Sequence, residues 1–367
     1  MKILLLGEYS NVHNTLAQGL RALGHSVTVA SNGDFWKDYP RDISLNRAKN
    51  KFGGIALAAK IGAILPRLCG YDVIQLINPL FVELKAERNL SLYKFLRRHN
   101  GKIFLAAYGM DYYWVSTCRE RKLLRYSDFN IGDTLRTNKD ALRETADWVG
   151  TEKERLNRYI ADDCDGIIAG LYEYFVCYKD HFAAKTVFIP FPIKMEQNRG
   201  AYETQTKRKV RIFIGINRTR SEYKGTDIML DAAEAIAAKY PDRTQLTVAE
   251  SVPFEQYKTM MDDADVILDQ LYSYTPAMNA LLAMSKGIVC VGGGEPEGYD
   301  ILGEDELRPI VNVLPTCDSV YEALERVVLN PQLLQRLKAE SIAYVARHHD
   351  YLKVAQAYER VYLAGDI

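Results

Sequence analysis

The stretch VRIFIGINRTRSEYKGTDIMLDAAEAIAAKY, residues 210–240, decides the fold. It begins with a continuous apolar run, VRIFIGI, and continues through a loop that carries Arg218, Arg220 and Lys224. From residue 226 the pattern is helical. A continuous apolar run followed by a helix indicates one strand–helix unit of a parallel sheet that is covered on both faces. The basic loop between them is either an ordinary solvated loop or a socket for an anion.

The same alternation fills nearly the whole chain. The apolar runs of the first half are KILLL, SVTVAS, YDVIQLI, KIFLAAYG, DGIIAG and TVFIPFPI, and those of the second half are VRIFIGI, QLTVAE, VILDQ and IVCVGGG. A polar stretch near residues 194–208 fits a linker. We therefore expect an α/β chain with two doubly wound, Rossmann-like domains, 1–200 and 201–349. A final helix over 350–367 is expected to pack back on the first domain.

Composition excludes several classes of protein. The 367 residues suit two domains, and 47 basic residues balance 47 acidic ones, which argues against binding nucleic acid through a broad electrostatic footprint. None of the six cysteines forms a CxxC pair or has a histidine at metal-ligand spacing, so no zinc site is expected, and Cys290 is interpreted as core. The first apolar run is too short for a signal peptide or a membrane span. We expect a cytoplasmic, soluble chain, at most peripheral to a membrane.

Ligands of such sheets bind beyond the carboxyl ends of the strands, and with two sheets the default site is the cleft between domains. In the first half, the residues directly after strands are Gly7, Ser10 and Asn11 in one loop, and Gly109, Asp111 and Tyr112 in another. Asp111 is expected to face the cleft. The alternative for the first loop is a simple capped turn, and the aromatic residues 112–114 are either a stacking surface or a hydrophobic plug.

The second half offers an anion site. Gly225 keeps the backbone open, Thr226 is expected to cap the following helix, and the free amides of a helix start attract anions. Arg218 and Lys224 supply the charges expected for a diphosphate. A second helix start is expected from Thr275 as N-cap and Pro276 as first residue, with two amides pointing into the cleft. The candidate nucleotide-binding residues are Gly215, Arg218, Lys224, Thr275, Ala277, Met278, Asn279 and Glu295.

Taken in order, these motifs resemble the GT-B glycosyltransferases, specifically the retaining family 4-like group. The resemblance covers essentially the whole chain. It is carried by KILLLG, GMD, IPFPI, the R…KGTD loop, LLAMSKGIVCV, the Gly-Gly-Glu-Pro-Glu loop and the final RHHD before a helix. It implies two domains facing each other across a cleft, the first for the acceptor and the second for a nucleotide-diphosphate sugar.

The resemblance also implies roles for residues. Arg218 and Lys224 would stabilise the departing diphosphate without a metal, and Asp111 and Glu297 would complete the catalytic set. Glu295 and Glu297, in the glycine-rich loop, could accept sugar hydroxyls, although a plain turn is the alternative. The chain departs from the family at two glutamates, which align with Tyr274 and Leu282. Asn279 and Glu297 are candidate substitutes.

Three functions follow from the resemblance. The first is a glycosyltransferase that uses no metal or other cofactor, acting with retention in bacterial surface polysaccharide or glycolipid assembly. The second is a catalytically degenerate protein that binds a nucleotide sugar or a glycan. The third is a nucleotide-sugar epimerase of the same architecture.

One further stretch, Arg47 to Arg67, mixes basic and apolar residues at near-helical spacing. Such a pattern is typical of helices that lie in a membrane interface. We expect it on the acceptor side of the protein and in contact with an anionic bilayer. The alternative is a helix packed in the core.

Overall fold

The structure, a computed structural model, describes residues 1–195, 209–250 and 252–364. The chain divides into two compact units. Unit 1 comprises Met1–Leu123, Leu142–Pro192 and Tyr351–Ile367, and unit 2 comprises Leu124–Ala141 and Ile193–Asp350. The segment Leu124–Ala141, expected within the first domain, thus belongs to unit 2. The linker expected near 194–208 lies outside the described residues from residue 196 onward.

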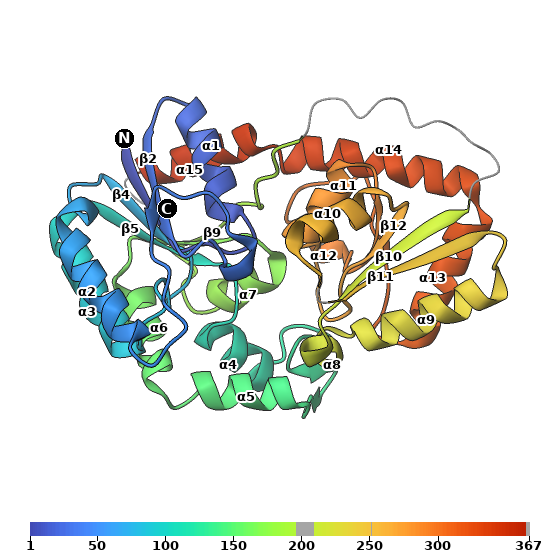
Figure 1. The fold of residues 1–367 in the computed structure, drawn as a ribbon, viewed down its shortest axis with the longest axis horizontal. Coiled ribbons are helices and arrows are strands. Elements are labelled where there is room, and N and C mark those ends of the chain that lie inside the picture. The colour runs from blue at the N-terminus through green and yellow to red at the C-terminus, as the bar shows by residue number, and fades with distance from the viewer. Residues whose placement is uncertain (196–208, 251, 365–367) are drawn as a thin grey trace. The chain divides into compact units, whose positions relative to one another are not determined.

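Unit 1 is built on a parallel sheet in the order β3-β2-β1-β4-β5-β8-β9. Figure 1 labels β2, β4, β5 and β9 of this sheet. Strand β1 lies inside this sheet between β2 and β4, and it is fully buried from Ile3 to Leu6, as its continuous apolar run predicts. The strand order reverses between β1 and β4, which makes their carboxyl ends the topological switch point. The strands are β1 (Lys2–Leu6), β2 (Ser26–Ser31), β3 (Ile43–Ser44), β4 (Val73–Leu76), β5 (Lys102–Ala107), β8 (Gly166–Ala169) and β9 (Thr186–Phe188).

Helices cover this sheet, and the C-terminal helix is one of them. Helix α15 lies beside α1, where a Cβ on Gly19 would come within 2.5 Å of the Tyr351 carbonyl oxygen (Figure 1). Glycine therefore allows the close approach of the two helices. The helical segments are α1 (Val12–Ala22), η1 (Phe35–Lys37), α2 (Gly53–Ile64), η2 (Leu65–Leu68), α3 (Ala86–His99), α4 (Tyr112–Glu120), α6 (Glu152–Asp163), α7 (Tyr172–Lys179) and α15 (Tyr351–Leu363). Helix α5 (Lys139–Trp148) contains the boundary at residue 141.

Unit 2 repeats the plan with a parallel sheet in the order β11-β10-β12-β13-β14. Its strand order reverses between β10 and β12. The elements are β10 (Val210–Ile216), η3 (Arg218–Arg220), α8 (Ser221–Lys224), α9 (Thr226–Lys239), β11 (Thr244–Glu250), α10 (Phe254–Asp262), β12 (Val266–Leu268), α11 (Met278–Ser285), β13 (Val289–Gly292), α12 (Pro296–Asp300), β14 (Val311–Asn312), α13 (Cys317–Leu329) and α14 (Pro331–His348). The segment Leu124–Ala141, called the hairpin segment below, also belongs to this unit. It contains an antiparallel hairpin of β6 (Asn130–Ile131) and β7 (Thr134–Leu135).

The core of unit 2 follows the period-two alternation of its strands. Ile212 and Ile214 of β10 join one apolar cluster with residues of α9 and α13, while Phe213 contacts the Tyr257 ring of α10, with ring centroids 5.1 Å apart. Cys290 is 1% exposed, which confirms its interpretation as core. The two-domain α/β architecture expected from the sequence is therefore present.

Candidate functional site

The switch point of unit 2 brings together the loop after β10 and the loop after β12. Lys224 ends α8, and its carbonyl oxygen accepts a 3.0 Å hydrogen bond from the Leu271 amide. Asp269 follows β12 directly. Burial raises the pKa of Asp269 to about 6, while the positive charge of Lys224 and a hydrogen bond from Asn279 act in the opposite direction. An ammonium, a carboxylate and an amide thus meet at the carboxyl edge of the sheet.

Tyr257 closes one side of this cluster. Its hydroxyl accepts a 2.9 Å hydrogen bond from the Asn279 amide. A Cβ on Gly215 would lie 2.6 Å from the Tyr257 ring, so a side chain at position 215 would displace the ring. Gly215, Lys224 and Asn279, three of the candidate nucleotide-binding residues, therefore belong to one neighbourhood. The sequence analysis missed Asp269 and Tyr257, although Asp269 stands in VILDQ directly after a predicted strand.

Arg218 has a different partner. Its side chain is 79% exposed, and its Nε donates to the carboxylate of Glu250, the last residue of β11. The contact raises the pKa of Arg218 and lowers that of Glu250. The Arg218 side chain thus pairs with Glu250, whereas the charge of Lys224 acts on Asp269. Arg220, the third basic residue of this loop, is half-buried, with its guanidinium 5.1 Å from the centre of the Tyr223 ring.

The N-caps of α9 and α11 differ from those that the sequence predicts. Helix α9 is capped by Gly225 in the left-handed conformation (φ 74°), and the Thr226 hydroxyl contacts Ser221 Oγ at 2.8 Å. Helix α11 begins at Met278 with Ala277 as N-cap, two residues later than the Thr275–Pro276 pattern predicts. Thr275 is buried, and its carbonyl accepts from Ser273 Oγ at 2.6 Å. The free amides at this helix start are consequently those of Met278, Asn279 and Ala280.

The hairpin segment supplies a residue that the sequence did not point to. Arg125 donates two hydrogen bonds to Glu297 and one of 2.6 Å to Glu295. Its backbone amide donates to the Tyr274 hydroxyl at 2.6 Å, and its guanidinium lies 5.0 Å from the centre of that ring. The Tyr126 hydroxyl also donates to Glu295. The two glutamates, expected to be available for sugar hydroxyls, are therefore held by Arg125, whose guanidinium lies over the ring of Tyr274.

A second arginine ties the hairpin to the basic loop. Arg136 donates to the carbonyls of Glu222 at 2.7 Å and Tyr223 at 3.1 Å, directly before Lys224. Its guanidinium lies 3.4 Å from the centre of the Tyr272 ring. The loops after β10, β12 and β13 are thus joined on one side by Leu124–Ala141. No sequence signal marked this segment because its partners are far away along the chain.

Asp111 of unit 1 has a structural role. It is fully buried as the N-cap of α4, and its carboxylate accepts from the Trp114 amide at 2.9 Å and from the Tyr178 hydroxyl at 2.7 Å. Burial raises its pKa to about 7. The expectation that this carboxylate faces a cleft is therefore corrected, because a helix start encloses it. Tyr112 is buried beside it and accepts from Arg158, and Gly109 lies against the ring of Tyr9.

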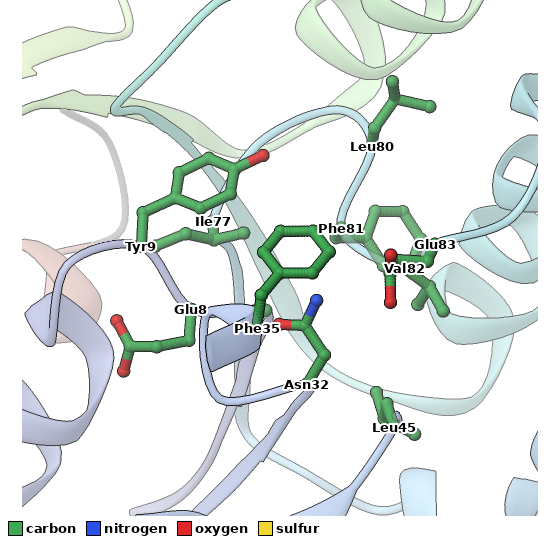
Figure 2. Close-up of a pocket in the computed structure, with 11 residues that line it drawn as sticks. Glu8, Tyr9, Asn32, Phe35, Leu45, Ile77, Leu80, Phe81, Val82 and Glu83 are labelled. Carbon is green, nitrogen blue, oxygen red and sulfur yellow. The ribbon is translucent and has the colours of Figure 1, made fainter. Parts of the chain in front are cut away.

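The switch point of unit 1 contains a pocket of about 110 Å³ (Figure 2). It is lined by residues that follow β1, β2, β3 and β4, namely Gly7, Glu8, Tyr9, Asn32, Phe35, Leu45, Ile77, Leu80, Phe81, Val82 and Glu83. Gly7 (φ 87°) has no room for a Cβ, which would lie 2.1 Å from Ile77 Cγ2. Ser10 and Asn11 continue the turn at φ 51° and 72°, a conformation that non-glycine residues rarely adopt.

Glu8 is buried under this turn and holds the start of α1. Its carboxyl oxygens accept from the amides of His13 at 3.2 Å and Asn14 at 2.8 Å. Burial raises the pKa of Glu8 to about 8, and the amide hydrogen bonds oppose the shift. His13, also buried, contacts the Gly7 carbonyl at 2.8 Å through Nδ1, and burial lowers its pKa to about 4.

These shifts predict how stability depends on pH. Folded Glu8 keeps its proton up to about pH 8, whereas the unfolded chain loses it near 4.5, so stability falls as pH rises through that window. His13 has the opposite effect on stability, and only below pH 6.5. There stability falls as pH falls, because the unfolded chain binds a proton that the buried ring does not take up. Between pH 6.5 and pH 8, the titration of Glu8 should therefore lower the free energy of unfolding by about 2 kcal/mol. Urea unfolding of Glu8→Gln should show a flatter profile there than the wild type, and parallel profiles would contradict this assignment.

Within the described ranges, no group of three histidine, cysteine, aspartate or glutamate side chains is arranged to hold a metal ion. No helix among the described residues is both long and apolar enough to cross a bilayer. The expectation of a metal-independent reaction stays a prediction.

Known structures share this fold. No family model and no curated protein matches the sequence. Sucrose-phosphate synthase from Thermosynechococcus elongatus matches with a TM-score of 0.65 at 13% identity, over 99% of this chain and 98% of that one. HepE from Anabaena, in complex with UDP-glucose, matches at 0.58 and 12% identity over 98% of both chains. UDP-GlcNAc 2-epimerase from Neisseria meningitidis, bound to UDP-GlcNAc, matches with a TM-score of 0.56 at 12% identity, over 99% of this chain and 100% of that one. At this identity the likeness establishes the fold, and the chain has the two-domain GT-B architecture.

Proposed function

We propose that the chain is a glycosyltransferase that moves a sugar from a nucleotide-diphosphate donor to an acceptor hydroxyl. Unit 2 binds the donor and unit 1 binds the acceptor. The observation that carries the proposal is the meeting of Lys224, Asp269 and Asn279 at the switch point of unit 2, where ligands of such sheets bind. Structural neighbours with UDP or a UDP-sugar bound support the choice of ligand.

Lys224 has the central role in this proposal. Negative charge develops on the diphosphate as the glycosidic bond breaks, and a positioned ammonium stabilises that charge. Asp269, whose pKa the charge of Lys224 lowers, offers acceptor oxygens to a ribose or sugar hydroxyl. Met278, Asn279 and Ala280 add free amides at the start of α11. Arg218, exposed and held by Glu250, reaches the diphosphate only by exchanging that partner.

Transfer, with retention, is the proposed reaction, in assembly of a bacterial surface polysaccharide or glycolipid. Because one structural neighbour is an epimerase, epimerisation of the nucleotide sugar is the alternative reaction to test. The test is to incubate the protein with UDP-, GDP-, ADP- and dTDP-sugars and to identify every product. A transferase releases nucleoside diphosphate and free sugar slowly when no acceptor is present. A changed sugar still linked to its nucleotide would instead identify an epimerase, and binding with no product would identify a degenerate member.

The proposed reaction needs no divalent metal because cationic side chains can balance the diphosphate. Donor hydrolysis should keep its rate in excess EDTA, and added Mg²⁺ or Mn²⁺ should change it by less than about two-fold. Loss of turnover in EDTA that Mg²⁺ or Mn²⁺ restores would refute this expectation.

The proposal includes peripheral binding to an anionic membrane through α2. Only Gly53, Leu57 and Ile61 of this helix are buried, so the alternative of a helix packed in the core does not hold. Phe52 is 61% and Ile55 63% exposed. From Ile43 to Tyr71 the chain has five basic residues and no acidic one: Arg47, Lys49, Lys51, Lys60 and Arg67. An exposed apolar face with basic neighbours suits an anionic bilayer.

Charge reversal tests this surface. The double variant Lys60→Glu and Arg67→Glu should reduce partitioning to vesicles containing phosphatidylserine by at least about ten-fold, since each basic residue near such a surface contributes about 1 kcal/mol. Arg326→Glu with Arg336→Glu, exposed on α13 and α14, makes the same change of net charge in unit 2 and should have little effect. Equal partitioning of both double variants and the wild type would exclude α2 as the contact.

A further inference from the structure

The pocket at the switch point of unit 1 has a lining without any basic side chain. Figure 2 shows the ring of Phe35 in its middle, with the carboxyl groups of Glu8 and Glu83 on opposite sides of that ring. Phosphate and carboxylate ligands are normally met by arginine, lysine or free helix amides. The amides at the start of α1 are partly used by Glu8. The lining therefore disfavours an anionic ligand.

Three polar groups of the pocket have unused hydrogen-bonding capacity. In the part of the chain that the structure describes, neither the Glu83 carboxylate nor the Tyr9 hydroxyl has a hydrogen-bond or ion-pair partner. Asn32 accepts from the Asp34 amide through Oδ1 at 3.1 Å, which leaves its Nδ2 for a ligand. Glu83 is partly buried. A carboxylate without a counter-charge in a partly buried, partly apolar pocket favours a cation.

The apolar part of the pocket fits the same conclusion. Phe35 is 59% exposed and adopts φ 59°, which is strained for a bulky residue. The turn that holds it is fixed by the Lys37 ammonium, which binds the Asp34 carboxylate at 2.6 Å, while that carboxylate accepts from the Ser10 amide at 2.9 Å. Strain that the surroundings maintain is common where a ligand is clamped. With Tyr9 and Phe81, Phe35 offers the aromatic faces that attract cations.

We propose that this pocket binds the ammonium group of an amino sugar on the acceptor, through an ion pair with Glu83 and the aromatic face of Phe35. The inference rests on the proposed function and specifies its acceptor. The cavity of about 110 Å³ takes one substituted edge of a sugar ring, since a single water occupies about 30 Å³ of liquid. The hydroxyls beside the amine pair with Tyr9 and Asn32, and the rest of the acceptor remains outside the pocket.

The test uses free monosaccharides as probes and saturation-transfer NMR at pH 6.5, where the amine is protonated. Glucosamine should bind the wild type about ten-fold more tightly than glucose, N-acetylglucosamine or glucuronate. Glu83→Gln should abolish this preference and leave weak binding of all four sugars. Phe35→Ala should weaken all of them. Glu87→Gln removes an exposed carboxylate in the first turn of α3 and should change nothing.

The opposite results are clear. Equal affinity for the four sugars, a preference for glucuronate, no binding of any sugar, or a glucosamine preference that survives Glu83→Gln would each overturn the inference. Binding of UDP to Lys224 variants is measured separately and does not involve this pocket. Failure of the amino-sugar site is therefore distinguishable from failure of the proposed transferase, which would appear as a loss of nucleotide binding in the wild type.

Discussion

Lys224→Ala should lower kcat for sugar transfer by about 10²–10³, the range observed when one preorganised donor to a developing anion is removed. The loss should fall on kcat more than on the KM for the donor, because the ammonium interacts most strongly with charge that develops as the glycosidic bond breaks. The neighbouring carboxylate should also respond. Lys224 lowers the pKa of Asp269, so the variant should have a still higher Asp269 pKa.

Stability should hardly change in this variant. A partly exposed lysine at the end of a one-turn helix contributes little to folding, and the melting temperature should move by less than about 2 °C. Lys239→Ala is the matched control, because it removes the same charge from the opposite end of α9, where Lys239 pairs with Glu325 at 2.8 Å. Lys224→Ala with wild-type turnover would show that the loop is ordinary surface. An equal loss in Lys239→Ala would show that net charge, and not position, is responsible.

Arg125→Ala should destabilise unit 2 by about 2–3 kcal/mol at pH 7. Breaking a buried ion pair by removing one partner costs more, about 3–5 kcal/mol, but the Arg125 side chain is 55% exposed and its contribution is reduced by solvent screening. The variant leaves Glu295, whose side chain is 6% exposed, with Tyr126 as a partner, near a second unpaired carboxylate on Glu297. Two neighbouring carboxylates without a counter-charge repel each other.

The loss should depend on pH. Arg125 lowers the pKa of Glu297, so the pair contributes stability above about pH 4.5, and this contribution is lost as pH falls. Urea unfolding at pH 7 and pH 3.5 should therefore show a large difference between Arg125→Ala and the wild type only at the higher pH. Arg336→Ala, which removes an exposed arginine 3.5 Å from Glu340, should change stability by less than 0.5 kcal/mol. An equal loss at both pH values would assign the effect to packing.

Sequence reasoning identified the architecture because the signals for it are local. The runs KILLL and VRIFIGI coincide with β1 and β10, and the helical pattern from residue 226 coincides with α9. Continuous apolar runs and 3.6-residue periods depend only on near neighbours in the chain. Gly24 is a similar local signal, since it has φ 89° directly after the C-cap of α1, where glycine commonly ends a helix.

The details of the candidate site were less accessible because they depend on distant partners. The Thr275–Pro276 pattern has the composition of a helix start, yet Ala277 is the cap. Asp111 stands after a strand, as a cleft residue would, but the Tyr178 hydroxyl and the Trp114 amide enclose it. Arg125 is 170 residues away from Glu295 along the chain, and no local pattern predicts that contact. Local sequence patterns therefore located the loops. Contacts between residues far apart in the sequence determined which side chains of those loops lie together.

The central claim is that the switch point of unit 2, with Lys224, binds a nucleoside diphosphate. Isothermal titration calorimetry of the wild type and of Lys224→Ala with UDP, GDP, ADP and dTDP tests it most directly. We expect one nucleotide to bind the wild type with 1:1 stoichiometry and to raise its stability by about 2.7 kcal/mol at 100 times its Kd. We also expect that Lys224→Ala, but not Lys239→Ala, weakens that binding. Absence of binding by all four nucleotides, or equal affinity in the wild type and Lys224→Ala, would contradict the account.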